Sequence, residues 1–234
     1  MKNEECNIMI ISKKEISRDI IQSYLNKTMF KIFLLGMISG LPWVLIGTSL
    51  TLWLKEDGFS RSAVGWSGLI FSVYAFNFLW APLIDKCSIP YLTNKLGTRK
   101  SWILVMQILI ILSLIIWSFL DINKIGEKYY LTSVIFVGLI IAISSATQDI
   151  TIDALRIELV KKNEHNLIAA GASMTVIGWW TSFKLGGMIT LFISNFLQNN
   201  GYVNYWQITF LCLTIFIILM NFGLLTIYEK NNSN

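Results

Sequence analysis

The stretch "WILVMQILIILSLIIWSFL", residues 102–120, contains no charged side chain in 19 consecutive positions. The hydrocarbon core of a bilayer is about 30 Å thick, and a helix needs roughly 20 apolar residues to cross it. Five further apolar stretches have a similar length, so the sequence predicts six membrane-spanning helices. We place these helices at 30–54, 62–84, 102–120, 129–147, 168–195 and 206–228.

The composition agrees with this assignment. Hydrophobic residues make up 54% of the chain and charged residues only 14%, whereas soluble domains are about a quarter charged. We therefore expect an all-α integral membrane protein with a cytoplasmic N-terminal segment (1–29), a six-helix bundle (30–228) and a short cytoplasmic tail (229–234). The first 29 residues are polar and do not resemble a cleavable signal, so the first span is expected to direct its own insertion.

Lysine and arginine are distributed unevenly between the two sides of the predicted bundle. Cytoplasmic loops are enriched in these residues. Fourteen lie on one side, against four on the other and Lys184 within a span. The fourteen are Lys2, Lys13, Lys14, Arg18, Lys27, Lys31, Lys86, Lys95, Arg99, Lys100, Arg156, Lys161, Lys162 and Lys230. This asymmetry predicts that both termini are cytoplasmic, and it accounts for the net charge of +5 without a nucleic-acid partner.

The predicted spans differ in the size of their side chains. Small residues follow one face of the first span and one face of the fifth, and such stripes allow helix backbones to approach closely. They are Gly36, Gly40, Gly47, Gly171, Gly178 and Gly186. Spans 102–120 and 206–228 are almost entirely bulky, so we expect them to face lipid. Pro42 interrupts the first span, which is tolerated inside protein or beside a cavity.

The nine tryptophans fall into two groups. Six lie near span ends, where tryptophan is expected at the membrane interface. They are Trp53, Trp66, Trp80, Trp102, Trp117 and Trp206. The other three, Trp43, Trp179 and Trp180, are in mid-span, where they either pack in the core or stack on a sugar ring.

The segment "SATQDITIDALRIEL", residues 145–159, places charges where an apolar run ends. Asp149, Asp153 and Arg156 are spaced i, i+4 and i+7, so they share one helical face. We expect them at the cytoplasmic end of the fourth span and in the loop after it. Three interpretations compete: capping of a helix end, with Asp153 and Arg156 as a local pair; Mg²⁺ binding for diphosphate chemistry; and gating or coupling in a transporter.

The magnesium interpretation requires a second acidic cluster on the same side of the membrane, and only Asp85 lies near a span there. We therefore expect neither an enzyme nor a bound metal or cofactor. Asp85 belongs to "FLWAPLIDK" (78–86), which precedes "GTRKS" (97–101). Together these segments are similar to the loop D-[RK]-x-G-[RK]-[RK] between the second and third helices of major facilitator transporters, with a longer insertion between its two parts.

Four segments in order resemble one family within that superfamily, the AmpG-type muropeptide permeases. They are "SGLPWVLIGTSLTLWLKEDGFS" (39–60), "FLWAPLIDK" (78–86), "GTRKSWILVMQ" (97–107) and the 145–159 segment. The resemblance implies the N-terminal half of a major facilitator fold in the bacterial inner membrane. It also implies import of anhydromuropeptides from periplasm to cytoplasm, coupled to protons. Eukaryotic acetyl-CoA transporters have a similar TQD-x-x-x-D segment.

The resemblance further implies roles for individual residues. The gating or coupling corner comprises Gln148, Asp149, Asp153 and Arg156, and a second gate comprises Asp85, Arg99 and Lys100. The chain departs from the family at Asn77, where a lysine is common, and at Trp179 and Trp180, where a Tyr-Arg pair is common.

Lys184 lies one helical turn beyond Trp180 on the same face. Two interpretations stay open for it: binding of substrate carboxylates, in place of the missing arginine, or reaching to the outer interface.

The length of the chain leaves three functional hypotheses. Major facilitators have two six-helix halves with the substrate between them. The chain either works with a separately encoded second half or as a homodimer, or is a shortened remnant that transports nothing, or carries another cargo such as acetyl-CoA.

Overall fold

The computed structural model describes residues 24–160 and 165–225, so predictions for 1–23, 161–164 and 226–234 lie outside it. Within the described ranges the chain is helical and has no strand. Six helical stretches are long and apolar enough to cross a membrane, as predicted. They are Lys27–Glu56, Arg61–Leu79, Thr98–Phe119, Glu127–Leu159, Leu167–Asn199 and Tyr205–Leu224.

The first span is the most buried of the six, with 67% of its apolar window inside the bundle. It consists of α2 (Lys27–Val44), a π-helical turn (Leu45–Ser49) and α3 (Leu50–Glu56). The Asn26 side chain caps α2 by accepting a hydrogen bond from the Thr28 backbone N–H at 3.2 Å. Pro42 lies inside α2, just before the π-helical turn.

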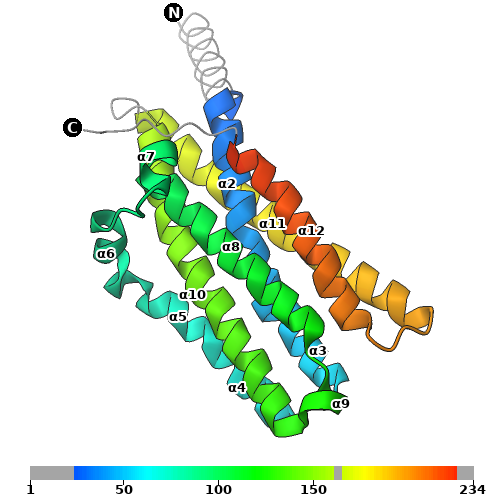
Figure 1. Cartoon of the computed structure of the whole chain (residues 1–234). Coiled ribbons are helices and arrows are strands. Elements are labelled where there is room, and N and C mark those ends of the chain that lie inside the picture. Colours follow the sequence, from blue (N-terminus) through cyan, green and yellow to red (C-terminus); the bar gives the residue numbers. More distant parts are fainter. Residues whose placement is uncertain (1–23, 161–164, 226–234) are drawn as a thin grey trace, which may run out of the picture.

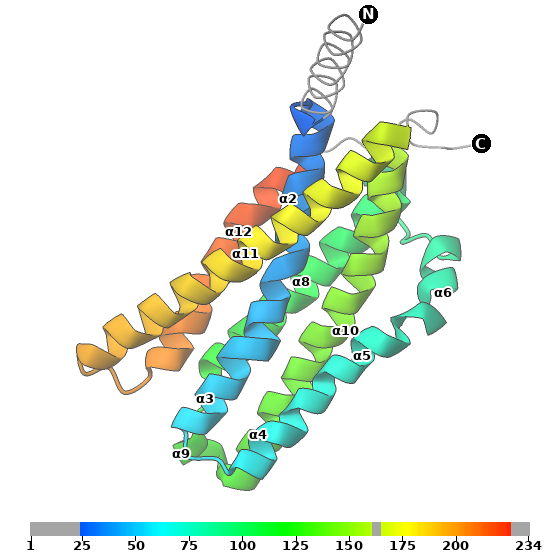
Figure 2. The same cartoon turned by 180° about the vertical axis from the view of Figure 1, so that it is seen from behind.

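The second span is broken into short pieces and lies along the side of α10 (Figures 1 and 2). The pieces are α4 (Arg61–Ser67), η2 (Gly68–Phe71), α5 (Ser72–Phe76), η3 (Asn77–Leu79) and α6 (Ala81–Lys86), followed by α7 (Leu92–Leu96). Only 11% of its apolar window is buried, so one side of this span has no neighbour within the described chain.

Four regular helices and one short helix complete the bundle. They are α8 (Thr98–Phe119), α9 (Ile122–Ile125), α10 (Glu127–Leu159), α11 (His165–Asn199) and α12 (Tyr205–Leu225). Helix α8 packs against α10 and α12, and α11 lies against α2 (Figure 2).

The prediction that spans 102–120 and 206–228 face lipid is wrong for much of their surface. Within the bundle, α8 buries 44% of its window and α12 buries 33%, against 22% for the fifth span. Bulky side chains fill a core as well as they meet lipid, so their size does not identify the outer face. The polar side chains Ser101, Gln107 and Ser113 of α8 are all buried, so this helix has neighbours on more than one side.

Part of the glycine stripes brings α2 and α11 into backbone contact. The predicted close approach at these faces is confirmed, but the sequence did not identify the partner of each helix, and the fifth span is only 22% buried. A Cβ atom on Gly36 would lie 2.2 Å from the backbone oxygen of Thr175, and one on Gly178 would lie 2.2 Å from that of Phe33. Real Cβ atoms do not approach backbone atoms so closely, so any larger residue at these positions forces the helices apart.

Three tryptophans predicted at the membrane interface are instead fully buried. Trp53, Trp117 and Trp206 are 0%, 0% and 1% exposed, and each has an aromatic contact with Phe210. Two of the three indole N–H groups have an acceptor. Trp206 Nε1 donates to Glu56 Oε2 at 2.7 Å and Trp117 Nε1 to the Val134 oxygen at 3.1 Å. Trp53 Nε1 is buried without a hydrogen-bond partner among the described residues, so its place in the core depends on the ring contacts with Trp117 and Phe210.

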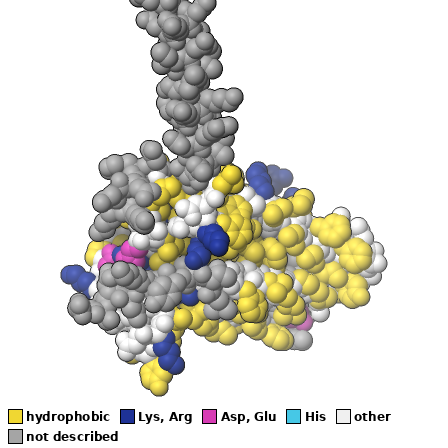
Figure 3. Space-filling view, turned by 90° about the horizontal axis from the view of Figure 1, so that it is seen from above, with side chains coloured by type: hydrophobic (Ala, Val, Ile, Leu, Met, Phe, Trp, Pro, Cys, Tyr) yellow, Lys and Arg dark blue, Asp and Glu magenta, His cyan; other side chains and the backbone are white. Residues whose placement is uncertain are grey.

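The start of α2, the α6–α8 connection, the end of α10 and the end of α12 all lie at one end of the bundle (Figure 1). Figure 3 looks onto this end and shows Lys and Arg side chains at several points of it, with hydrophobic side chains along the flank. The described structure therefore agrees with the separation of basic residues on which the topology prediction was based.

Candidate functional site

Helix α10 continues well beyond the end predicted for the fourth span. We expected residues after 147 to form a helix end and a loop, but α10 runs to Leu159, so this prediction is wrong. No glycine or proline occurs between residues 139 and 170 that would stop the helix. Thr151, Ile152 and Leu155 are buried on its inner face. The charged segment is therefore part of the bundle.

A cavity of about 460 Å³ opens between α2, α10 and α11, within the size range of small-molecule sites. It is lined by Ser39, Trp43, Asp149, Ile152, Asp153, Arg156, Thr175, Val176, Trp179 and Trp180. We call it the α2/α10/α11 cavity. It brings together two groups that the sequence singled out separately, the charged face of α10 and the mid-span tryptophans.

Asp149 is held at the wall of this cavity by a side chain from α2. The Ser39 hydroxyl donates to Asp149 Oδ1 at 2.6 Å, and Ser39 is only 6% exposed. Hydrogen bonds to a charged carboxylate are stronger than those between neutral groups. Sequence reasoning did not select Ser39, although a polar residue next to Gly40 on the small face of the first span was an available signal.

Asp153 and Arg156 form the local pair that the sequence predicted. The Arg156 guanidinium lies 3.1 Å from Asp153 Oδ1, and the two side chains are 20% and 61% exposed. A pair as exposed as this adds little to stability. Its relevance is that it places a cation and a second carboxylate at the same wall as Asp149.

The three tryptophans are not equivalent. Trp43 packs against Tyr74 of α5 at 4.4 Å between ring centroids, and Trp179 stacks on Phe183 at 5.3 Å. Both rings are thus partly covered by neighbouring aromatic side chains. Trp180 is 50% exposed, so it is the tryptophan with an open ring at the cavity.

Lys184 lies next to the cavity without lining it. Its Nζ atom is 5.7 Å from the centre of the Trp180 ring, within the range of a cation–π contact. The predicted alignment of Lys184 and Trp180 on one face of α11 is confirmed by this contact.

Gln148 does not line the cavity. It is fully buried between α10, α8 and α2, where it accepts a hydrogen bond from Gln107 of α8 and donates one to the Ile38 backbone oxygen of α2 at 3.2 Å. Of the four residues predicted for the corner, three therefore face the cavity and the fourth joins α10 to its neighbours.

The second predicted gate lies where α6 and α10 end and α8 begins. Arg99 is 3.6 Å from Asp85 and 2.8 Å from Glu158, so it connects all three helices. Lys100 follows it on α8 and is 7% exposed. The sequence prediction omitted Glu158. Its position two residues after Arg156, in the same charged segment, could have indicated that it belongs to this gate.

Among residues 24–160 and 165–225, no group of three or more His, Cys, Asp or Glu side chains is arranged to hold a metal ion.

Comparison with known proteins supplies relatives over most of the chain. "Putative transporter AmpG 4" of Rickettsia felis is 31% identical over 211 residues, which are 90% of this chain and 48% of that protein. "Putative transporter AmpG 3" of Rickettsia prowazekii is 38% identical over 164 residues, 70% of this chain and 37% of the relative. The anhydromuropeptide permease of Escherichia coli K12 is 29% identical over 164 residues, 70% of this chain and 31% of the relative. No family model matches the chain.

The chain thus spans about half the length, or less, of the curated relatives it matches. Its six apolar helices form a multi-pass membrane protein of the kind expected for half of a major facilitator fold. The relatives are named as transporters or permeases, and they match 70–90% of this chain. The chain belongs to the AmpG family of transporters.

Proposed function

We propose that this chain is the N-terminal half of a permease that imports anhydromuropeptides across the bacterial inner membrane. The observation that carries the proposal is the α2/α10/α11 cavity, where a carboxylate, a cation and an open aromatic ring meet. The Escherichia coli relative named anhydromuropeptide permease supports the choice of cargo. The end rich in Lys and Arg faces the cytoplasm in this proposal.

A sugar–peptide cargo matches the groups around the cavity. Tryptophan offers an apolar face to a sugar ring, and Trp180 has the open ring. The carboxylates of a peptide match Arg156 at the wall and Lys184 beside Trp180. Because guanidinium groups bind carboxylates with two parallel hydrogen bonds, Arg156 is the stronger candidate for this contact.

Asp149 is the residue we assign to coupling. Ionisable groups within membrane-spanning helices mark ion and proton paths in transporters, and Asp149 lies within α10 at the cavity wall. Import would be driven by protons that bind and leave this carboxylate. Asp85, Arg99 and Lys100 form a gate in contact with a second half, which is supplied by another chain or by a second copy.

The test is uptake of labelled anhydromuropeptide by bacteria that lack their own permease and express this chain, alone or with the C-terminal half of a full-length relative. Membrane insertion is verified in the same cells. We expect uptake in at least one of the two cases and its loss in Asp149→Asn, with Asp57→Asn, a carboxylate outside the cavity, as the matched control.

Two outcomes contradict the proposal. Absence of uptake in both cases, despite good insertion, identifies a non-transporting remnant. Uptake of labelled acetyl-CoA in place of the muropeptide, in the same cells, identifies a transporter of the other cargo.

A further inference from the structure

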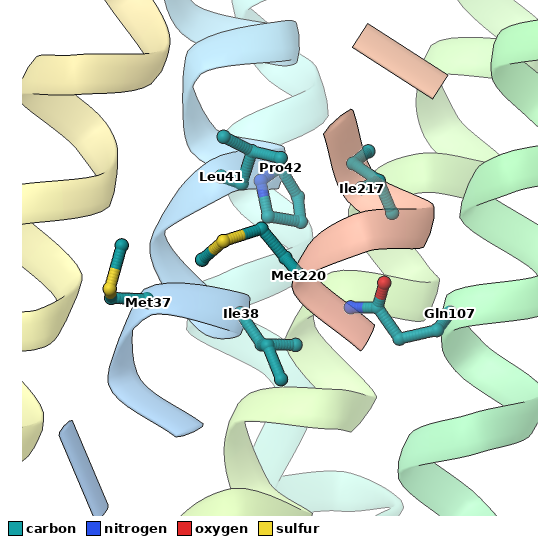
Figure 4. A pocket seen from close by; sticks show the side chains of 7 residues that line it. All are labelled: Met37, Ile38, Leu41, Pro42, Gln107, Ile217 and Met220. Carbon is teal, nitrogen blue, oxygen red and sulfur yellow. The ribbon is translucent and has the colours of Figure 1, made fainter. Parts of the chain in front are cut away.

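Pro42 leaves one backbone carbonyl of α2 without its helical partner. In a regular helix the N–H of residue 42 would bond to the oxygen of Ile38, but proline has no N–H. The cavity beside this point is about 10 Å³, no larger than one water molecule. Figure 4 shows Pro42 and Ile38 on α2, with Gln107 reaching toward them from α8. Ile38 is only 3% exposed, so its unpaired carbonyl needs a donor from within the bundle.

Three side-chain amides supply that donor through a continuous chain of hydrogen bonds. Asn221 of α12 donates to Gln107 Oε1 at 2.9 Å, and Gln107 Nε2 donates to Gln148 Oε1. Gln148 Nε2 then donates to the Ile38 oxygen at 3.2 Å. Each amide donates with nitrogen, and Gln107 and Gln148 also accept with oxygen, so the bonds run in one direction from α12 through α8 and α10 to α2. One acceptor of the network, Asn221 Oδ1, is buried without a hydrogen-bond partner among the described residues, so the outer end at α12 is less well satisfied than the Gln107–Gln148–Ile38 part.

The amide chain ends next to the candidate site. Gln148 directly precedes Asp149 on α10, and Ile38 directly precedes Ser39 on α2. Two neighbouring residues of one helix therefore bond to two neighbouring residues of the other, Gln148 to Ile38 and Asp149 to Ser39. The Gln148–Ile38 bond holds α2 in position along α10, and the Ser39–Asp149 bond can form only in that position.

We infer that Gln148, Gln107 and Asn221 are positioning residues of the α2/α10/α11 cavity. Their amides replace the backbone hydrogen bond missing at Pro42 and thereby hold Ser39 against Asp149, although none of the three lines the cavity. The inference goes beyond the proposed function, because it concerns the geometry of the cavity whatever the cargo is.

The test uses a cysteine reporter in the cavity wall. Ile152 lines the cavity and is 1% exposed, so Ile152→Cys reacts with a maleimide only when α2, α10 and α11 separate there. The reporter is placed in a full-length chain in which Cys6, Cys87 and Cys212 are serine. We expect Gln148→Met to raise the labelling rate about tenfold, as for loss of one buried hydrogen bond. Pro42→Ala restores an N–H for Ile38, so the double variant should label at nearly the parent rate.

Gln207→Met is the matched control. Gln207 also donates from its amide to a backbone oxygen, that of Leu120 at 3.0 Å, but near the other end of the bundle. The Gln207→Met variant should lower the unfolding temperature without changing the labelling rate of Ile152→Cys.

Asn221→Ala removes only the outer link of the amide chain, so it should raise the labelling rate less than Gln148→Met does. This variant tests the inference even if Gln148→Met does not fold. Unchanged labelling in both Gln148→Met and Asn221→Ala, an equal rise in Gln207→Met, or no rescue by Pro42→Ala overturns the inference.

Discussion

Asp149 and Ser39 show how one contact can turn a charged helix face into a candidate site. Helical spacing was enough to place Asp149, Asp153 and Arg156 together, and all three line the cavity. Nothing in that spacing indicated that a serine 110 residues earlier would donate to Asp149. The partner of a buried carboxylate depends on which helix packs opposite, and that is decided outside the segment itself.

Ser39→Ala is expected to lower uptake several-fold in an assembly that transports, since Asp149 loses its 2.6 Å donor. Membrane levels should not change. Ser49→Ala is the matched control in the first span, because Ser49 is also buried and its hydroxyl has no hydrogen bond within the described residues. Equal uptake in the two variants would show that the Ser39–Asp149 contact has no functional role.

Asp57, beyond the end of α3, predicts a pH dependence of stability. Burial raises the pKa of its carboxyl above the ordinary value of 3.8, and the nearby Glu56 adds to this, while a hydrogen bond from Tyr130 at 2.6 Å acts in the opposite direction. The folded protein therefore holds this proton to higher pH than the unfolded chain does. Stability contributed by the protonated group is present at low pH and is lost as the pH rises above 3.8 through the folded-state pKa.

Thermal unfolding of the detergent-solubilised protein between about pH 4 and 7 tests this expectation. Asp57→Asn should flatten the curve of unfolding temperature against pH. Tyr130→Phe should make the curve steeper, because it removes the bond that favours the charged carboxylate. A curve for Asp57→Asn that runs parallel to the parent curve would contradict the assignment.

At the scale of the elements, the contact between α2 and α11 depends on the absence of side chains. The glycine stripes were visible in the sequence, and the two helices meet at backbone distance at Gly36, Gly40 and Gly178. The same sequence reasoning failed for α8 and α12, because uniformly bulky helices carry no stripe to mark an inner face. Their contacts come mainly from apolar side chains of the core, such as Trp117 against Phe210, with the Gln107–Asn221 hydrogen bond as a polar link.

Gly178→Ala is expected to destabilise the bundle by about 1–3 kcal/mol, the usual cost of overpacking. The added methyl group would lie 2.2 Å from the backbone oxygen of Phe33, so the helices have to move apart. Gly187→Ala on the same helix is the control, since no atom lies within 4 Å of its Cβ position. That variant should be neutral or more stable by up to about 1 kcal/mol, from helix propensity alone. Equal unfolding temperatures for the two variants would exclude close packing as the role of Gly178.

At the scale of the whole molecule, the basic residues mark one end of the bundle. The described parts of the chain begin and end there, beside the α6–α8 connection (Figure 1). Cys87 is exposed in this connection, and Lys128 is exposed near the opposite end, in the first turn of α10. The positive-inside rule predicts that the first faces the cytoplasm and the second the periplasm.

A membrane-impermeant maleimide added to spheroplasts tests the orientation, in chains where Cys6 and Cys212 are serine. We expect no labelling of Cys87 until the cells are lysed, and immediate labelling of Lys128→Cys in a chain that also carries Cys87→Ser. The reverse pattern would mean that the charged corner of α10 faces the periplasm, which would contradict the proposed direction of the gates.

Sequence alone determined the number of spans, the small-residue faces of the first and fifth spans, and the shared face of Asp149, Asp153 and Arg156. Each depends on local quantities: the length of an apolar run, the size of side chains on one face, and the periodicity of a helix. Only the tertiary structure decided that Ser39 holds Asp149, that three amides join four helices beside Pro42, and that Trp53, Trp117 and Trp206 are core residues. Each of these depends on which side chains face one another across helices distant in the chain, and the order of residues along a single helix does not specify that.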